Sequence, residues 1–230
     1  RRQRQMCIRD SKNTDLTNLD CSYSQLTSLD VSKNTALTHL HCFENQLTSL
    51  DVSKNTALTH LDCSYNQLTS LDVSKNTSLT HLRCTNNQLT SLDVSLCTRL
   101  TKLLCRDNQL TTLDVSDNKA LSDLNCNSNL VTTLDISSCK GLTKLSCSRN
   151  QLTSLDVSNH KALIDLNCAS NEPLTCLNLK NGNNVSMSLF FADNPNLTCV
   201  EVDDPIWSTS NWGSIFYTYS TNCKHPAGCF

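Results

Sequence analysis

A repeat of 21 residues runs through most of this chain. With Leu37 as position 1, the repeat reads LTxLxCxxNQLTSLDVSxNxx, and a last row of 22 or 23 residues ends at Val202. The 21-residue rows each begin at a leucine: Leu16, Leu37, Leu58, Leu79, Leu100, Leu121, Leu142 and Leu163. One row is too short to bury its own leucines, whereas stacked rows bury them against one another. The repeat therefore predicts a stack of equivalent coils.

The spacing of the leucines indicates what each coil contains. A fixed period of about 20 to 29 residues with LxxLxL spacing is typical of a leucine-rich repeat, in which every row adds one short strand to a parallel sheet. Alternation along an extended chain points positions 4 and 6 inward, and positions 1, 11, 14 and 16 fill the rest of the interior. The row leaves little room for a helix, and LTSLDVS alternates like a second short strand. We predict a right-handed leucine-rich repeat solenoid with a parallel β-sheet on its concave face, short strands and turns on its convex face, and little helix.

The turns of this solenoid are predicted from its polar residues. Neither glycine nor proline occurs before Gly141, so the turns are expected to be made by Asn, Asp, Ser and Thr, whose side chains cap nearby backbone groups. Position 9 is asparagine in row after row, for example Asn45 and Asn66. A stacked amide there can bond to the backbone of its own coil and of the neighbouring coil. We therefore expect an asparagine ladder.

Position 6 carries a cysteine in each of the eight rows that begin at a leucine. This column consists of Cys21, Cys42, Cys63, Cys84, Cys105, Cys126, Cys147 and Cys168. Neighbouring thiols are expected ~4.8 Å apart along the stack, but parallel side chains do not readily give the torsion of a disulfide. A straight column also cannot converge tetrahedrally on zinc. We predict a reduced ladder of buried thiols that serves packing, with no metal and no cofactor.

The row LTHLDCSYNQLTSLDVSKNTS resembles the cysteine-ladder leucine-rich repeats of internalin J-type surface proteins of Listeria and of secreted repeat proteins of flavobacterium-type bacteria. The resemblance covers about residues 7–202, and it is specific because the 21-residue period, the cysteine at position 6 and the LDVSxN tail occur together. The ending NLTCVEVDDPIWSTSNW also looks like the terminal cap of the flavobacterial proteins. The resemblance implies export, localisation in the medium or at the cell surface, and a role in adhesion or binding, not catalysis.

The two ends of the chain differ from the repeats. We assign residues 1–15 to an N-terminal partial repeat or leader, 16–202 to the solenoid and 203–230 to a C-terminal cap. The last segment is rich in aromatic residues, and a terminal coil exposes its core and its sheet edge unless something covers them. We expect this cap to contain one short helix near STSNWGSIF.

Cysteines outside the ladder suggest how the cap is held. A disulfide would fasten it, with Cys199 to Cys223 as the first choice and Cys176 to Cys199 as the alternative. Cys176 and Cys199 are expected to lie outside the core. Cys97 and Cys139 replace the asparagine of position 19 in rows separated by one coil, and are predicted to be too far apart to pair.

Several classes of function are disfavoured by the sequence. The formal net charge is −2 and no basic run follows RRQR, so no nucleic-acid partner is expected. No apolar stretch approaches the ~18 to 20 residues that span a bilayer, so no membrane insertion is expected. The motifs GxSxG, HExxH and CxxC and a phosphate-binding loop are missing, and we predict no enzymatic activity. A monomer is expected.

The variable positions of the repeat suggest a binding surface. Positions 3, 5, 7 and 8 face outward from the sheet, and in the N-terminal half they gather histidines, aromatic residues and charges on one patch. The candidate ligand-binding residues are His39, His41, Phe43, His60, Asp62, Tyr65, His81, Arg83 and Arg106. This patch is interpreted as a contact surface for a host or bacterial surface protein or glycan. It could instead hold a metal through its histidines and Asp62, or be an ordinary solvated face.

Three other interpretations stay open. Regular threonines at positions 2 and 12 could form an ice-binding surface, although threonine also simply favours β structure. Aspartates at position 15, such as Asp51 and Asp72, could bind calcium along the coils. The chain could also be a structural spacer in a larger surface protein.

Overall fold

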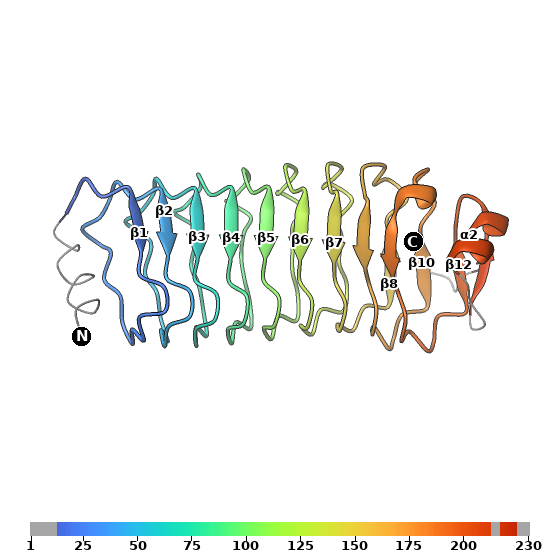
Figure 1. Cartoon of the computed structure of the whole chain (residues 1–230), viewed down its shortest axis with the longest axis horizontal. Helices are drawn as coiled ribbons and strands as arrows, with labels where there is room; N and C mark the ends of the chain where they lie inside the picture. The colour runs from blue at the N-terminus through green and yellow to red at the C-terminus, as the bar shows by residue number, and fades with distance from the viewer. Residues whose placement is uncertain (1–12, 213–216, 225–230) are drawn as a thin grey trace.

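The computed structural model describes residues 13–212 and 217–224, and it is a solenoid of stacked coils (Figure 1). Each coil contributes a strand of three residues to one parallel sheet, here called the long sheet. Its strands, in spatial order, are β1 (Asn18–Asp20), β2 (His39–His41), β3 (His60–Asp62), β4 (His81–Arg83), β5 (Lys102–Leu104), β6 (Asp123–Asn125), β7 (Lys144–Ser146), β9 (Asp165–Asn167) and β11 (Ser188–Phe190). The predicted leucine-rich repeat solenoid is confirmed.

The register of the long sheet follows the repeat. Leu40 of β2 pairs with Leu61 of β3, and Leu61 pairs with Leu82 of β4, so equivalent positions of successive rows stand side by side. Within each strand from β1 to β9 the central leucine is buried and its two neighbours face outward. The sequence columns of positions 3 and 5 are therefore real columns on the outer surface of this sheet.

A second, shorter parallel sheet forms at the C-terminal end of the solenoid. It contains β8 (Ser154–Asp156), β10 (Cys176–Asn178), β12 (Cys199–Glu201) and β13 (Thr218–Ser220), in the order β13-β12-β10-β8. The segment LTSLDVS was predicted to form a short strand in each coil, but before β8 the described coils have turns and bends there. Helix is scarce, as expected: the described elements include a 3-10 turn at Asn184–Ser186 and α2 (Pro205–Trp212).

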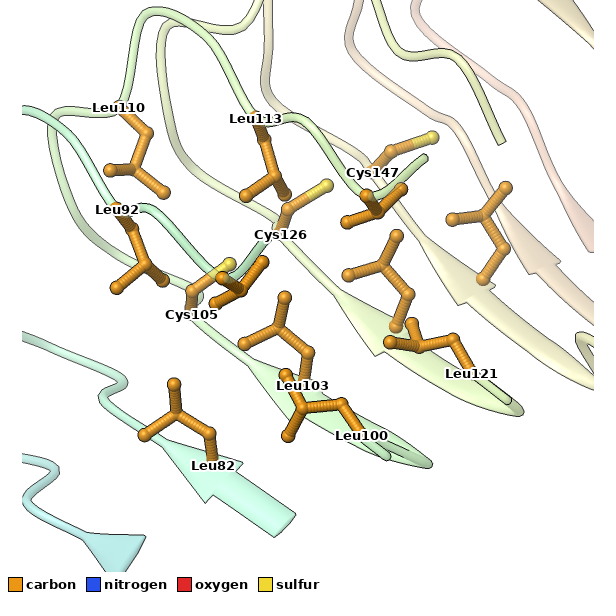
Figure 2. Close-up of a cluster of buried hydrophobic side chains, with 14 of the residues drawn as sticks. Leu82, Leu92, Leu100, Leu103, Cys105, Leu110, Leu113, Leu121, Cys126 and Cys147 are labelled. Carbon is orange, nitrogen blue, oxygen red and sulfur yellow. The ribbon is translucent and has the colours of Figure 1, made fainter. Parts of the chain in front are cut away.

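The interior is a continuous core of leucine, valine and cysteine. Leucines of positions 1, 4, 11 and 14 converge with the cysteines of position 6, as Figure 2 shows for Leu100, Leu103 and Cys105. Leu100, Leu103 and Leu110 are fully buried. Burying one leucine side chain contributes about 1.5 to 3 kcal/mol, so each coil is stabilised mainly by the coils on either side.

The cysteine column lies inside this core. All eight ladder cysteines are buried, and the seven from Cys42 to Cys168 are free thiols. Burial raises the pKa of the Cys126 and Cys168 thiols to about 12 and raises the pKa of Cys42, Cys84, Cys105 and Cys147 well above the usual value. Cys97 and Cys139 are also free and buried. These thiols act as small apolar side chains, because the reactive thiolate form is strongly disfavoured.

The asparagines of position 9 use every polar atom of their side chains. Asn66 Nδ2 donates to the carbonyl oxygens of Cys42 (3.0 Å), Cys63 (3.0 Å) and Ser64 (3.2 Å), and its Oδ1 accepts from the Leu47 N–H (3.0 Å). Asn87 and its counterparts repeat this pattern. Since an unpaired buried backbone group is costly, this ladder ties each coil to the one before it.

A second polar column, at position 19, works only as a donor in the rows that begin at Leu37 to Leu142. Asn76 Nδ2 donates to the carbonyls of Val52 (3.0 Å) and Asn55 (2.9 Å), while its Oδ1 is buried without a hydrogen-bond partner. Cys139 replaces asparagine in this column, and its thiol lies 3.6 Å from two carbonyl oxygens. His160 also occupies the column, with Nε2 3.0 Å from the Ile136 carbonyl. Because this column needs a donor and no acceptor, it accommodates three residue types.

The turn after each strand of the first eight rows passes through the left-handed region at position 8. The residues there, with φ between 52° and 56°, are Tyr23, Glu44, Tyr65, Asn86, Asp107, Ser128, Arg149 and Ser170. The expectation that turns would use only Asn, Asp, Ser and Thr is therefore wrong at Tyr23, Glu44, Tyr65 and Arg149. Hydrogen bonds between coils impose the conformation: the Tyr65 N–H donates to the Thr85 carbonyl (2.8 Å) of the next coil.

At the C-terminal end, aromatic side chains pack together beside the last strands. Trp207 and Trp212 of α2 lie edge to face with centroids 5.5 Å apart, and Trp212 lies 6.0 Å from Tyr219 of β13. The helix begins at Pro205, earlier than predicted, and residues 213–216 of the predicted helical segment lie outside the described residues. So do residues 1–12 of the predicted N-terminal partial repeat.

A disulfide joins Cys199 of β12 to Cys223. The alternative pairing of Cys176 with Cys199 is not formed, although Cys176 is disulfide-bonded as well. Cys176 was expected outside the core and is in fact buried, because it lies within β10 in the middle of the second sheet.

Candidate functional site

Six of the predicted binding residues lie on three adjacent strands of the long sheet. His39, His60 and His81 form one column, and His41, Asp62 and Arg83 form the next. The strands place both columns on the outer surface because their central leucines point into the core. The repeat therefore brings these side chains together as its alignment predicts.

A groove of 460 Å³ lies over β2 to β5 and over the turns that follow β1 to β4. It is lined by Tyr23, His41, Phe43, Glu44, His60, Leu61, Asp62, Ser64, Tyr65, His81, Arg83, Thr85 and Leu104. Seven of the nine predicted residues are in this lining. Two are not: His39 stacks beside it, and the Arg106 side chain bonds instead to its neighbour Asp107, with Nε 2.7 Å from Oδ2.

The groove also contains residues that the predicted site left out. Tyr23 and Glu44 both occupy position 8, the left-handed turn position that also holds Tyr65. The signal was available, since Tyr23 has the same repeat position as Tyr65. Leu104 is the position-5 residue of β5 and closes the C-terminal end of the groove.

The three histidines of position 3 form a stack. The ring centroids of His39 and His60 are 4.3 Å apart with an interplanar angle of 11°, and those of His60 and His81 are 4.3 Å apart at 13°. Each ring nitrogen Nδ1 lies 2.9 to 3.0 Å from the hydroxyl of the preceding threonine, which is Thr38, Thr59 or Thr80.

These threonines fix which nitrogen of each neutral histidine carries the proton. Thr59 Oγ1 lies 3.1 Å from the Thr38 carbonyl oxygen, and a carbonyl oxygen only accepts, so the single hydroxyl proton is donated there. Thr80 donates in the same way to the Thr59 carbonyl (3.0 Å). The hydroxyl oxygen of Thr59 and of Thr80 is then the acceptor for Nδ1–H of the adjacent histidine, and this hydrogen-bond network assigns the tautomer of His60 and His81. In the neutral state Nε2 of His60 and His81 is left with a free lone pair.

The environment of the stack keeps these rings neutral. Burial lowers the pKa of His60, and the neighbouring imidazoles of His81 and His39 lower it further. Burial is also the main cause of the lowered pKa of His81, followed by the charges of Lys102 and Arg83. At neutral pH His60 and His81 are thus uncharged imidazoles.

Aromatic faces and carboxylates surround the stack. Tyr23 is 64% exposed and lies edge to face with Phe43, with centroids 4.9 Å apart, and Tyr65 is 47% exposed. Asp62 accepts a hydrogen bond from the Ser64 N–H (3.1 Å), and its nearest cation is Arg83, at 3.9 Å. At 3.9 Å and with a half-exposed guanidinium, this ion pair contributes little stability.

The rest of the long sheet has a different character. The position-3 column continues as Lys102, Asp123, Lys144 and Asp165, which alternate in charge. Lys102 Nζ lies 2.6 Å from Asp123 Oδ2. Histidines therefore mark the N-terminal half of this column, and charges of alternating sign mark the half that follows.

The described residues also bear on a metal ion, on calcium and on a membrane. Among residues 13–212 and 217–224, no group of three or more His, Cys, Asp or Glu side chains is arranged to hold a metal ion. The aspartates of position 15, such as Asp51, accept the N–H of the serine two residues later (Asp51 to Ser53, 2.9 Å). None of the helices in the described part of the chain has the length and apolar character to cross a membrane.

Comparison with known proteins agrees with the geometry. A family model of two-copy leucine-rich repeats matches residues 56–96. No curated protein is significantly similar to the chain. Two solved structures share the fold at low identity: an internalin (InlF) from Listeria monocytogenes (19% identity, TM-score 0.70, 93% of this chain and 63% of that chain) and the effector YopM from Yersinia pestis (22%, 0.70, 88% and 61%). The chain is a leucine-rich repeat protein.

Within that class, the chain is internalin-like and carries a cysteine ladder. The functional domain of InlJ from Listeria monocytogenes, described as including a cysteine ladder, is 33% identical, with a TM-score of 0.65 over 92% of this chain. The chain spans only 55% of the InlJ chain. The internalin-like fold suggests a protein-binding module.

Proposed function

We propose that the chain is a non-enzymatic, extracellular binding module that recognises a surface protein through the groove over β2 to β5. The observation that carries the proposal is the groove itself: exposed Tyr23 and Tyr65 and half-buried Phe43 gather along it, on the N-terminal half of the long sheet. Aromatic residues with neighbouring arginine and histidine are typical anchors of protein interfaces. A parallel sheet of equivalent strands presents them on a rigid surface.

An extracellular location is supported by two observations. The similarity to InlJ points to a surface or secreted protein. The disulfide between Cys199 and Cys223 suits an oxidising compartment, in which the buried ladder thiols stay reduced because no oxidant reaches them.

Binding measurements against purified bacterial and host surface proteins test the proposal. The groove variant is Tyr65→Ser, and the matched control is Ile164→Ser. The two side chains are equally exposed, at 47% for Tyr65 and 48% for Ile164, but Ile164 lies beside β9, outside the groove. A protein that binds the wild type and Ile164→Ser, and binds Tyr65→Ser at least about ten-fold more weakly, would support the groove as the contact surface.

Other results would overturn the proposal. Equal loss in both variants, or no loss in Tyr65→Ser, would place the contact elsewhere. Binding to glycans alone would replace a protein partner by a glycan. A chain that binds no protein and no glycan would be a spacer, or an ice-binding protein if it also shows thermal hysteresis.

A further inference from the structure

The ligand chemistry of the groove can be worked out from its hydrogen-bonding groups. Because Thr59 and Thr80 take the Nδ1–H of His60 and His81, the free Nε2 atoms of these two groove residues are acceptors. In the described residues, neither Nε2 has a protein hydrogen-bond partner. The groove therefore presents two parallel acceptors that a ligand must satisfy with donors.

The charges at this end of the sheet also favour a ligand that carries hydrogen-bond donors and positive charge. The carboxylates of Glu44 and Asp62 line the groove, and Asp20 of β1 pairs in register with His41 beside it. Arg83 is the one cation among the residues that line the groove in the described chain. With His60 and His81 neutral, the groove and its β1 border hold the three carboxylates of Glu44, Asp62 and Asp20 and one guanidinium, that of Arg83. The exposed ring faces of Tyr23 and Tyr65 add surfaces on which a cation can stack.

We propose that the groove binds a basic segment of a protein partner, whose arginine or lysine side chains donate to the Nε2 row and pair with Asp62 and Glu44, and that acidification releases this segment. The proposal rests on the proposed function and names the chemistry of its partner. Arginine fits best, because its planar guanidinium offers several donors at once, pairs with carboxylates and stacks on aromatic rings.

Release on acidification follows from the same geometry. Protonation turns each Nε2 from an acceptor into a donor and places positive charges 4.3 Å apart in a stack that already faces Arg83. The titratable and charged groups around His60 and His81 are His39, His41, Glu44, Asp62, Arg83, Lys102 and Asp123. Lys102 is neutralised by Asp123, so it does not offset the carboxylates that attract a basic ligand.

A labelled heptapeptide of alternating glycine and arginine tests the proposal on the full chain. Its counterpart with citrulline keeps the shape of arginine but has no charge. At pH 7.5 we expect the arginine peptide to bind at least about ten-fold more tightly than the citrulline peptide, and to lose about ten-fold in affinity at pH 5.5.

Variants assign this binding to the groove. Asp62→Asn should weaken binding roughly ten-fold, whereas Asp165→Asn on β9, which removes a carboxylate outside the groove, should leave it unchanged. The double variant His60→Phe/His81→Phe keeps a stack of aromatic rings but removes both acceptors and both titrating groups. It should bind more weakly at pH 7.5 and lose most of the pH dependence. Circular dichroism verifies that each variant is folded, and Asp62→Asn keeps the test valid if the double variant is not.

Several outcomes would overturn the inference. These are equal affinity for the arginine and citrulline peptides, wild-type binding that is the same at both pH values, and equal effects of Asp62→Asn and Asp165→Asn. A surface protein whose binding requires Tyr65 but does not change with pH would overturn the inference while leaving the proposed function intact.

Discussion

Replacing Asn66 by cysteine should destabilise the protein much more than replacing Asn76 by cysteine, although both are buried asparagines of equivalent ladders. At position 19 a cysteine keeps the only role that Asn76 has, donation to the backbone, as Cys97 and Cys139 already do. It also removes an oxygen that is buried without a partner. At position 9 a cysteine removes the acceptor on which the Leu47 N–H depends.

The size of the difference follows from which groups lose their partners. Without Asn66 Oδ1, the buried Leu47 N–H is unpaired, which costs about 1 to 3 kcal/mol. The carbonyls of Cys42 and Cys63 each keep one other asparagine donor, Asn45 or Asn87, so their loss is smaller. We expect about 2 to 4 kcal/mol for Asn66→Cys and at most about 1 kcal/mol for Asn76→Cys.

Urea unfolding followed by circular dichroism measures both values. The samples are kept under nitrogen without reductant, so that the thiols stay reduced and the disulfide stays intact. If the slope of the unfolding free energy with urea is unchanged, the shift in midpoint reports stability alone. Equal costs for the two variants, or a cost below about 1 kcal/mol for Asn66→Cys, would refute the distinction between a donor-acceptor column and a donor-only column.

Three further predictions concern other features. Burial raises the pKa of Cys126 and Cys168 to about 12, so iodoacetamide at pH 8 should leave both thiols unmodified in the native protein and modify them after unfolding. Mass spectrometry measures the modification, and labelling of the native ladder would contradict its burial. Folding lowers the pKa of His60 and of His81, so below about pH 6.5 the unfolded chain binds more protons than the folded chain. The stability of the protein should therefore fall as the pH drops from about 6.5 through the folded pKa values. The Tm values at pH 7.5 and 5.5 should differ less in His60→Phe/His81→Phe than in the wild type. Ser128→Gly should raise the free energy of unfolding by up to about 1 kcal/mol and so raise the urea midpoint, because Ser128 has φ 53° and glycine adopts that φ without strain. Part of this gain is offset by the larger conformational entropy of glycine in the unfolded chain. A lower midpoint for Ser128→Gly would show that the strain is absent.

Much of the fold was predictable because one row of sequence determines all the others. The period, the inward leucines and the cysteine column follow from counting, and the role of Asn66 follows from the need to pair buried backbone groups. The donor-only column was not predictable, since Cys139 and His160 look like unrelated exceptions to the asparagine of position 19 until their hydrogen bonds are known. The left-handed turns were also hidden, because inter-coil hydrogen bonds impose them on side chains such as Tyr65 that do not favour them.

The candidate site was predictable to the extent that register places residues. Column alignment brought His60 beside His81 and Asp62 beside Arg83. It could not show that Arg106 bonds to its own neighbour, outside the groove. It also could not give the proton positions, which depend on the distance from the hydroxyl of Thr59 or Thr80 to a carbonyl oxygen of the preceding coil.

The position-9 ladder gives the solenoid an order of completion. Each asparagine reaches back: Asn66 pairs the Leu47 N–H and Asn87 pairs the Leu68 N–H, in each case in the coil before. A coil therefore has its buried backbone satisfied only when the next coil is in place. In a chain synthesised from its N-terminus, folding would follow synthesis one coil behind, and at every stage the most recent coil would be the incomplete one.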